Sequence, residues 1–351
     1  MSEWSTQNSV GAWSQQLLSM CVGHGASDLH VSTQQVPCLR IVGRLERVSE
    51  QRLTADQLDR LLQHWLSEAQ WAQLMAERSV DVASTQPAGR FRINAFHHQH
   101  GRAAALRHIP DTVPSLQALD LPPIFDELKR ADQGLVLITG ATGSGKSTTL
   151  AALLDAINRE RAAHIVTIED PVEFMHRSHK SLVHQRQVGR DTHRFEDALR
   201  AALRQDPDVI MIGELRDTET IRLALTAAET GHLVLASLHT LSAPKAIDRI
   251  IDVFDSHEKA LVRAMLAQSL RAVVAQQLVP AATGGRVAVC EVMTATPAIR
   301  NLIREGQVAQ MHSAMQTGQA HGMMTMAQAL RQREQAGQCL PRGPDQGLTE
   351  V

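Results

Sequence analysis

The feature that most constrains the fold of this 351-residue chain is a glycine-rich segment with the spacing of a phosphate-binding loop, Gly140-Ala141-Thr142-Gly143-Ser144-Gly145-Lys146-Ser147. It follows an apolar run that reads as a strand and precedes a helical pattern, which is the place that such a loop requires. Glycines let backbone N–H groups curl around phosphates, and the helix N-terminus adds a favourable field for an anion. We expect Lys146 to reach the β and γ phosphates of a nucleotide, Ser147 to hold Mg²⁺ and Thr148 to complete the site. A glycine-rich turn without nucleotide is the alternative, which the strand and helix together with Lys146 and Ser147 disfavour.

After residue 124, short apolar runs alternate with longer helical patterns. The runs at 135–139, 165–168, 209–212 and 233–238 read as buried parallel strands. Such alternation is typical of an α/β sheet with crossover helices. One of these helices is predicted from Thr218, as its N-cap, to about Thr230, with Gly231 ending it in the left-handed conformation.

The first part of the chain mixes strand-like runs at 28–31, 38–42 and 90–96 with one clear helix. Thr54 and Gln57 have capping-box spacing at the start of this helix, and the leucines after them recur on one face. This part therefore reads as an α+β module. Because four prolines between 110 and 123 disfavour regular structure, we predict a first domain over 1–110, a linker over 111–123, a second domain over 124–337 and a disordered tail over 338–351.

Charge and hydropathy limit the classes of partner. With 35 Lys and Arg against 37 Asp and Glu, the net charge of −2 gives no indication of nucleic-acid binding. No apolar run approaches the roughly 18 residues that span a bilayer, and the N-terminus has no signal-peptide pattern. We therefore predict a cytoplasmic protein without an integral membrane segment. His97, His98 and His100 lie close together but lack a fourth ligand, which disfavours a specific metal site there.

A carboxylate follows the strand predicted at 209–212. Ligands of open α/β sheets bind at the carboxyl edge of the strands. Many P-loop enzymes place an Asp at this strand end to steady the metal, whereas here Gly213 occupies that place and Glu214 comes next. We predict that Glu214 polarises the attacking water. A simple surface carboxylate is the alternative, which the neighbouring phosphate loop disfavours.

A second strand end carries three acids, Glu169, Asp170 and Glu173. These side chains can bind a metal-bound water or steer the phosphates. Acids that only solvate a loop are the alternative reading.

Two histidines, His232 and His239, bracket the strand predicted at 233–238. His239 stands at the end where a γ-phosphate sensor would be useful, because a histidine can donate a hydrogen bond to phosphate. Taken singly, each histidine reads more simply as a packed or exposed side chain.

In their order and spacing, these four elements resemble the type II/type IV secretion ATPase superfamily, and in detail the PilT family of type IV pilus retraction ATPases. The glycine-rich loop is similar to its Walker A motif, the Glu169 segment to its Asp box, the Glu214 strand to its Walker B motif and the His239 segment to its His box. The resemblance runs from residues 26–30 to about Met324. It departs after Gly337 and at Ala141, where the family often has Pro.

The resemblance implies an α/β fold in which a RecA-like P-loop ATPase domain follows a smaller α+β, PAS-like domain. It implies ATP and Mg²⁺ as cofactors. It further implies a homohexamer, peripheral at the inner face of the cytoplasmic membrane, that acts on an inner-membrane pilus platform protein. In such a ring, arginines of the first domain cross to a neighbour's nucleotide, although each reads equally well as an ion-pair residue. The implied catalytic side chains are Glu214, Glu169, His239 and Arg107, and further nucleotide contacts are Glu173, His232, Arg90 and Arg92.

One segment is similar to the part of the family associated with retraction, Ala298-Ile299-Arg300-Asn301-Leu302-Ile303-Arg304-Glu305. By its pattern alone it is an amphipathic helix with its isoleucines and leucine buried. This segment and the short N-terminal region favour retraction over assembly or secretion. A non-catalytic ring that binds nucleotide and regulates a partner is the rival from another class, and Lys146, Ser147, Glu214 and His239 together argue against it.

Overall fold

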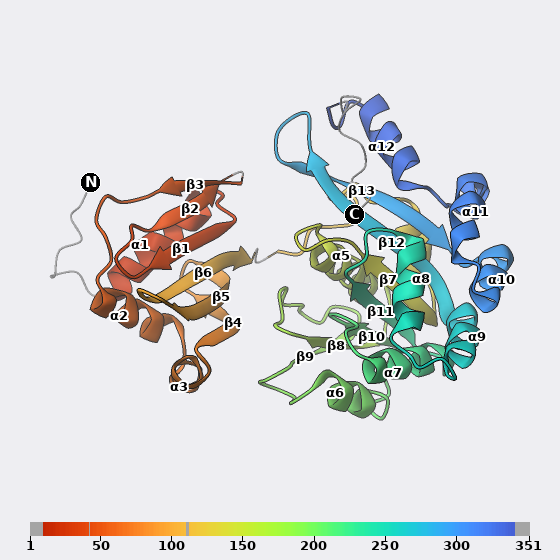
Figure 1. The fold of residues 1–351 in the computed structure, drawn as a ribbon, viewed down its shortest axis with the longest axis horizontal. Coiled ribbons are helices and arrows are strands. Elements are labelled where there is room, and N and C mark those ends of the chain that lie inside the picture. Colours follow the sequence, from red (N-terminus) through yellow and green to blue (C-terminus); the bar gives the residue numbers. More distant parts are fainter. Residues whose placement is uncertain (1–9, 42, 110–111, 341–351) are drawn as a thin grey trace. The chain divides into compact units, whose positions relative to one another are not determined.

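The computed structural model describes residues 10–41, 43–109 and 112–340. Contacts divide the chain into two units, residues 1–112 and 113–351, which are described one at a time (Figure 1). The predicted linker differs from this division. Residues 110 and 111 lie outside the described ranges, but Leu116 is buried in the same apolar cluster as Phe125 and Leu128 and so belongs to the second unit.

The first unit is a six-stranded antiparallel sheet in the order β3-β2-β1-β6-β5-β4. Its strands are β1 (Asp28–Ser32), β2 (Cys38–Ile41), β3 (Arg44–Arg47), β4 (Ser79–Gln86), β5 (Gly89–His98) and β6 (Gly101–Ile109). Three helices complete it, α1 (Val10–Gly23), α2 (Ala55–Trp65) and α3 (Glu68–Glu77). Helices and alternate strand residues share one apolar cluster, which leaves the other face of β5 and β6 for polar side chains.

The sequence predicted only one helix in this unit. The capping box of Thr54 and Gln57 at the start of α2 is confirmed. Helix α1 was missed because a buried polar residue interrupts its apolar face: Ser14 accepts a hydrogen bond from Trp65 Nε1 at 2.7 Å. Helix α3 was missed because it fully buries only Leu74, which gives no apolar periodicity to detect.

The second unit is built on a seven-stranded sheet in the order β13-β12-β7-β11-β10-β8-β9. All neighbours are parallel except β12 and β13. The strands are β7 (Gly134–Thr139), β8 (His164–Glu169), β9 (Leu182–Gln187), β10 (Val209–Ile212), β11 (Leu233–Leu238), β12 (Leu270–Pro280) and β13 (Arg286–Thr294). The four predicted strands are the adjacent central ones, and the predicted α/β fold is confirmed.

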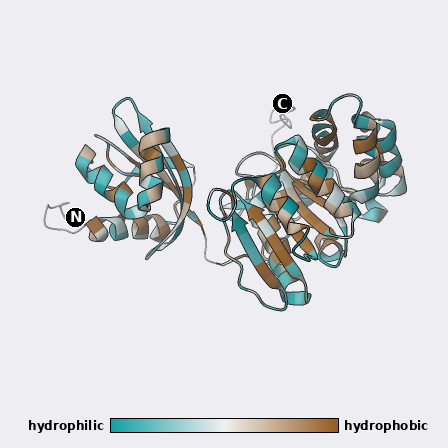
Figure 2. Ribbon diagram, turned by 90° about the horizontal axis from the view of Figure 1, so that it is seen from below, coloured by the Kyte–Doolittle hydropathy of each residue, from teal (hydrophilic) through white to brown (hydrophobic). Residues whose placement is uncertain are grey.

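Helices pack on both faces of this sheet. Leu135 and Leu137 of β7 join one core cluster, and Val136 and Ile138 join the other. Figure 2 shows the consequence, hydrophobic strands lying among helices that are hydrophilic on their outer sides. The helices are α4 (Ile124–Leu128), α5 (Lys146–Glu160), α6 (Phe195–Ala202), α7 (Thr218–Glu229), α8 (Ala243–Asp252), α9 (Lys259–Ser269), α10 (Pro297–Glu305), α11 (Met311–Thr317) and α12 (Met326–Gln335).

The predicted cap of α7 was wrong by one residue. Asp217, not Thr218, is the N-cap, and its carboxylate accepts a hydrogen bond from Thr220 N at 2.8 Å. Thr218 instead donates its hydroxyl to Val253 O. A carboxylate adds a charge interaction with the helix dipole that a hydroxyl lacks, so Asp217 is the stronger cap. Gly231, after the helix, has a positive φ of +108°.

Residues 338 and 339, at the start of the predicted tail, are packed on the second unit. Cys339 is buried against β12 and β13, and Ala282 N donates to Gln338 O at 2.9 Å. The remaining predicted tail residues, 341–351, lie outside the described part of the chain. No helix in the described ranges is both long and apolar enough to cross a bilayer.

Candidate nucleotide-binding site

The glycine-rich loop joins the carboxyl end of β7 to the first turn of α5. All six residues of β7 are buried, which fixes the start of the loop. Gly140, Gly143 and Gly145 have φ values of +147°, +79° and +88°, a region that side chains disfavour. The backbone therefore takes the curled path that a phosphate requires, and it ends at the N-terminus of a 15-residue helix.

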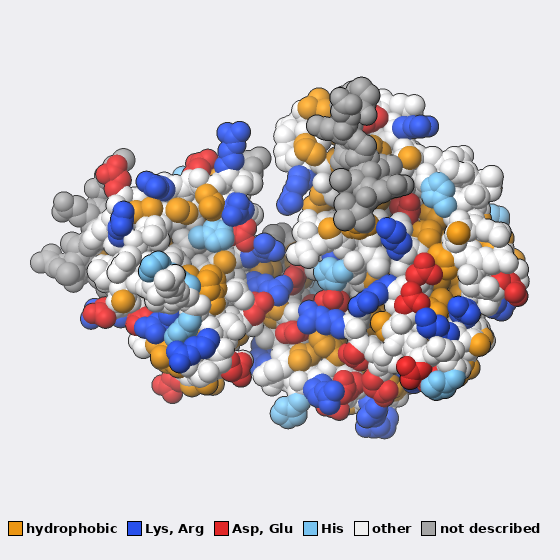
Figure 3. Space-filling model, viewed as in Figure 1, with side chains coloured by type: hydrophobic (Ala, Val, Ile, Leu, Met, Phe, Trp, Pro, Cys, Tyr) orange, Lys and Arg blue, Asp and Glu red, His pale blue; other side chains and the backbone are white. Residues whose placement is uncertain are grey.

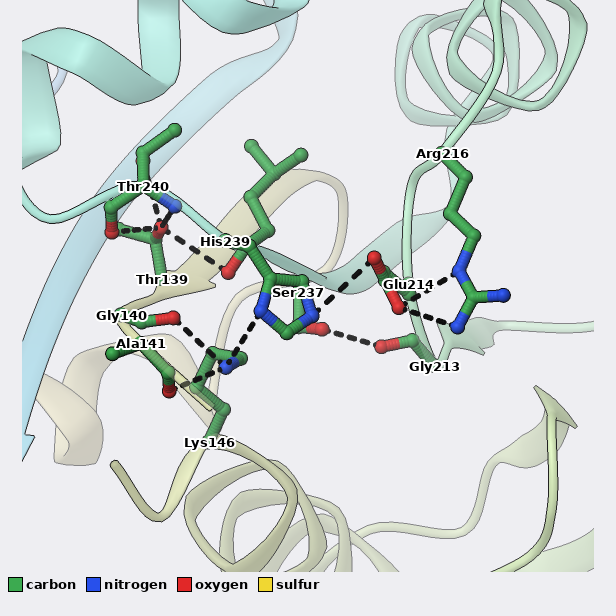
Figure 4. A network of polar contacts seen from close by, with 11 residues as sticks. Thr139, Gly140, Ala141, Lys146, Gly213, Glu214, Arg216, Ser237, His239 and Thr240 are labelled. Atoms are coloured by element: carbon green, nitrogen blue, oxygen red, sulfur yellow. Dashed lines mark hydrogen bonds and ion pairs between the residues drawn. The ribbon is translucent and has the colours of Figure 1, made fainter. Parts of the chain in front are cut away.

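Lys146 lies in the first turn of α5 with its side chain turned back over the loop. Its Nζ donates to the backbone oxygens of Gly140 and Ala141, both at 2.9 Å (Figure 4). Burial lowers the pKa of the Lys146 ammonium, and the carboxylates of Glu214 and Glu173 act in the opposite direction. A buried cation at a helix N-terminus is the group that a di- or triphosphate would pair with.

A polar chain connects the loop to the end of β10. His239 Nδ1 lies 3.5 Å from Lys146 Nζ, and His239 Nε2 lies 3.3 Å from Glu214 Oε1 (Figure 4). These two contacts agree with a neutral imidazole that accepts at Nδ1 and donates at Nε2. Glu214 Oε2 also accepts from Arg216 Nε and Nη2 at 2.9 Å. The structure therefore brings three predicted residues, Lys146, His239 and Glu214, into one group.

This group borders a pocket of about 370 Å³ whose lining includes Glu214, Arg216, His239 and Arg249. Arg216 and Arg249 were not predicted as site residues. Arg216 follows Glu214 by two residues, and this proximity in sequence was the signal that could have identified it. Arg249 lies on α8, 35 residues from Glu214 in sequence, and only the fold brings it here.

Glu169 ends β8 and is buried beside Gly213, where an added Cβ would lie 3.4 Å from the Glu169 Cα. Its Oε1 accepts from Thr167 Oγ1 at 2.7 Å and from Gln185 Nε2 at 3.1 Å. Burial raises the pKa of the Glu169 carboxyl to about 7, while the hydrogen bonds from Thr167 and Gln185 act in the opposite direction. A carboxyl poised near neutrality fits an acid–base role better than a solvated loop acid.

The raised pKa of Glu169 predicts a pH-dependent stability. The folded carboxyl holds its proton up to about pH 7, whereas an ordinary Glu releases it near 4.5, so folding takes up a proton between these values. The free energy of unfolding should therefore fall as pH rises from 4.5 to 7, by on the order of 3 kcal/mol from this group. Urea denaturation of wild type and Glu169→Gln across this range measures it. An identical slope in both proteins would contradict the assignment.

The remaining predicted residues of the second unit, His232 and Glu173, lie at different distances from the loop. His232 precedes β11 at the amino edge of the sheet, where its backbone oxygen accepts from Gly134 N, the first residue of β7. Its Nδ1 is 2.9 Å from Ala227 O. The loop lies at the opposite, carboxyl edge, so His232 does not lie beside the loop of its own chain, and its contact with nucleotide stays a prediction. Glu173 is half-buried and close enough to Lys146 and Glu169 to shift the pKa of each.

The three predicted arginines lie on one face of the first unit's sheet, because Arg90 and Arg92 alternate on β5 and Arg107 is the cross-strand partner of Arg92. Arg92 forms a two-point ion pair with Asp81. Arg107 Nε donates to Asp28 Oδ1 at 2.9 Å.

Arg107 forms this ion pair through Nε, and its side chain is 58% exposed. Arg90 Nη1 donates to Thr85 Oγ1. Ion-pair roles are thus present for two of the arginines, and a role in trans stays a prediction.

The histidine cluster of the first unit forms no metal site among the described residues. His98 Nε2 instead contacts Ser32 Oγ at 3.1 Å, and His97 Nδ1 contacts Arg78.

The loop fits a magnesium nucleotide. Ser144 Oγ is buried and has no partner among the described residues, and Ser147 is exposed at the start of α5. A polar atom left without a partner inside the loop is suited to a phosphate or its metal. Ser147 would hold the ion, with Lys146 on the phosphates beside it.

Strand, loop, helix, lysine and carboxyl-edge Glu214 together define a P-loop nucleotide-binding protein. The family model described as "Type II/IV secretion system protein" matches residues 5–340. The chain belongs to the type II/IV secretion system protein family, and within it to the PilT family, as the sequence predicted.

Two curated relatives and one solved structure support this membership. The chain is 50% identical to the type IV pilus retraction ATPase PilT of Pseudomonas aeruginosa, over 90% of this chain and 92% of that protein. It is 48% identical to a twitching motility protein of Neisseria gonorrhoeae, over 87% of this chain and 82% of that protein. A crystal structure of the pilus retraction motor PilT with bound ADP superposes with a TM-score of 0.84 at 42% identity, covering 92% of this chain and 93% of that chain.

Proposed function

We propose that this chain is a Mg²⁺-dependent ATPase that works as a homohexameric motor and powers type IV pilus retraction from the inner face of the cytoplasmic membrane. The observation that carries the ATPase activity is the chain of contacts from Lys146 through His239 to Glu214 at the carboxyl edge of the sheet. Retraction is supported by relatives named for it that align with the chain along most of their length.

Each side chain takes one role in hydrolysis. Lys146 binds the β and γ phosphates, and Ser147 holds Mg²⁺, which supplies charge neutralisation on the phosphate oxygens. Glu214 orients and polarises the attacking water, since its Oε1 faces His239 and its Oε2 is held by Arg216. His239 senses the γ phosphate by hydrogen bonding to it. Glu169, whose carboxyl has a pKa of about 7, supplies a second carboxyl near Gly213.

The resemblance implies the hexamer, and the arginines are given a role in it. Arg107, Arg90 and Arg92 share one face of the first unit's sheet, and they are proposed to reach the nucleotide of a neighbouring chain. An arginine supplied in this way makes hydrolysis depend on ring geometry.

Nucleic acid is not proposed as the cargo. Figure 3 shows basic and acidic side chains interspersed on the visible face rather than a basic track. The partner proposed is an inner-membrane platform protein of the pilus.

The helix α10 contains the segment associated with retraction, and its residues divide by exposure. Ile299 and Ile303 are buried, and Leu302 is partly buried. Arg300, the cation at its centre, donates to the backbone oxygens of Ala267, Gln268, Leu270 and Ala295. Arg300 therefore anchors α10 to the end of α9, and replacing it would disturb the fold rather than isolate an output surface.

The exposed residues of α10, such as Asn301 and Arg304, offer a cleaner test. In a strain lacking this gene, we expect excess surface pili and no twitching. Wild type restores both, and a protein with Asn301→Ala and Arg304→Ala is expected to retain ATPase activity without restoring twitching. Arg331→Ala, which removes an exposed arginine from α12, is the matched control and should restore both.

Four outcomes would redirect the proposal. Normal piliation and twitching in the deletion strain would exclude retraction as the main role. Loss of pili would indicate an assembly ATPase, and loss of secreted proteins a secretion ATPase. A purified wild-type ring that binds ATP without hydrolysing it would instead establish a non-catalytic regulator.

A further inference from the structure

A buried glutamine of β12 contacts both ends of the junction between the phosphate loop and α5. Gln276 is only 2% exposed. Its Nε2 donates to Ser144 O at 2.8 Å, and its Oε1 accepts from Thr149 Oγ1 at 2.8 Å. Ser144 precedes Lys146 and Thr149 follows it, so one side-chain amide spans the turn that carries Lys146.

The position of Gln276 follows from strand register. β12 runs parallel to β7, with Ala275 opposite Thr139, the last residue of β7. Gln276 therefore lies just past the end of β7, where the loop begins. The strand continues here while β7 stops, which leaves the loop seated on β12.

Gln276 also explains two of the loop's glycines. A Cβ at Gly140 would lie 2.3 Å from the backbone oxygen of Gln276, and a Cβ at Gly145 would lie 2.8 Å from its Nε2. Cβ atoms do not approach other heavy atoms this closely, so a side chain at Gly140 would clash with the backbone of β12 and one at Gly145 would displace the Gln276 amide. These glycines are required by packing against Gln276 as well as by backbone conformation.

The two hydrogen bonds of Gln276 hold the phosphate loop in a defined position relative to α5. In an apolar interior, an amide that satisfies one donor and one acceptor holds both in place, and removing it leaves them unpaired at a cost. Ser144 O and Thr149 Oγ1 have no other hydrogen bond among those the structure shows for the described residues. Loss of Gln276 should let the loop relax from its phosphate-binding path.

From these contacts we infer that Gln276 is a positioning residue for the nucleotide phosphates, acting through the loop and Lys146 without touching the reacting atoms. The inference rests on the proposed nucleotide binding and adds a residue to that site. It makes β12 the third support of the loop, beside β7 and α5.

The test compares two neighbouring glutamines. Gln276→Leu removes both contacts at similar volume, and Gln277→Leu changes the next residue, which is only half-buried and on the opposite face of β12. In the full-length protein we expect the ADP dissociation constant to rise about tenfold or more for Gln276→Leu, as one buried hydrogen-bond pair predicts. For Gln277→Leu it should stay within about twofold of wild type.

A second readout separates positioning from general destabilisation. AMP lacks the β phosphate that the loop and Lys146 bind, so its affinity should change less than that of ADP. The preference for ADP over AMP should therefore collapse in Gln276→Leu and persist in Gln277→Leu. An unchanged preference in Gln276→Leu overturns the inference.

If Gln276→Leu does not fold, Thr149→Val carries the test, since it deletes only the hydroxyl that donates to Gln276. We expect a several-fold loss of ADP preference, and full retention overturns the inference. Tight ADP binding without hydrolysis in wild type would defeat the proposed motor and leave the role of Gln276 standing. A wild-type protein that binds no ADP would defeat both.

Discussion

Glu214→Gln is expected to lower the ATPase kcat by about 10²–10⁴-fold, the range that a positioned general base contributes. The amide keeps the size of the carboxylate but cannot take a proton or polarise water. The contacts with His239 and Arg216 are made by separate oxygens, and an amide nitrogen cannot accept a hydrogen bond, so a glutamine can keep only one of them. Affinity for ADP should change little, so the loss should appear in kcat and leave binding intact.

A control for this loss is available in another carboxylate that pairs with an arginine. Glu219, on α7, pairs with Arg200 at 2.6 Å and lies outside the site. Glu219→Gln should keep wild-type kcat, since an exposed pair contributes little even to stability. Steady-state phosphate release measures both proteins. A Glu214→Gln enzyme within threefold of wild type would remove Glu214 from the mechanism.

Lys146→Ala is expected to abolish measurable ATP turnover and to weaken ADP binding about 10- to 100-fold, which corresponds to losing charged hydrogen bonds to phosphate. The variant should fold, because burial disfavours the Lys146 ammonium and its loss relieves that cost. Its melting temperature without nucleotide should stay within a few degrees of wild type. The stabilisation that ADP gives to wild type should largely disappear.

Lys259→Ala is the matched control, because Lys259 lies at the start of α9 and pairs with Asp252 away from the loop. It should keep both turnover and the shift in melting temperature on adding ADP. Wild-type turnover in Lys146→Ala would mean that the glycine-rich loop is not the catalytic nucleotide site.

Much of the second unit could be predicted because local sequence is enough there. The four central strands are fully or nearly fully buried on both faces, so each is a continuous apolar run. Two other strands, β9 and β12, were not predicted because polar residues reduce or interrupt their apolar runs. β9 lies at the edge of the sheet and is mostly polar, LVHQRQ, and β12 carries Gln276 and Gln277 in an apolar stretch. Their strand character comes from their neighbours.

The site divides in the same way. Residues 140–147, Glu214 and His239 are predicted as site residues because their spacing from a strand end is itself the signal, and the structure brings Lys146, His239 and Glu214 together. The end of β11 at which His232 lies could not be predicted, because only the parallel register shows that this end is the one away from the loop.

The amino-acid sequence by itself determined the family, the phosphate loop and the central strands, since these depend on runs of consecutive residues. Only the tertiary structure decided which distant side chains serve the loop. Gln276 reaches Ser144 across 132 residues of sequence, and Arg300 anchors α10 to backbone oxygens about 30 residues away. A buried hydrogen bond depends on where both partners lie in space, and no local pattern in the chain encodes that.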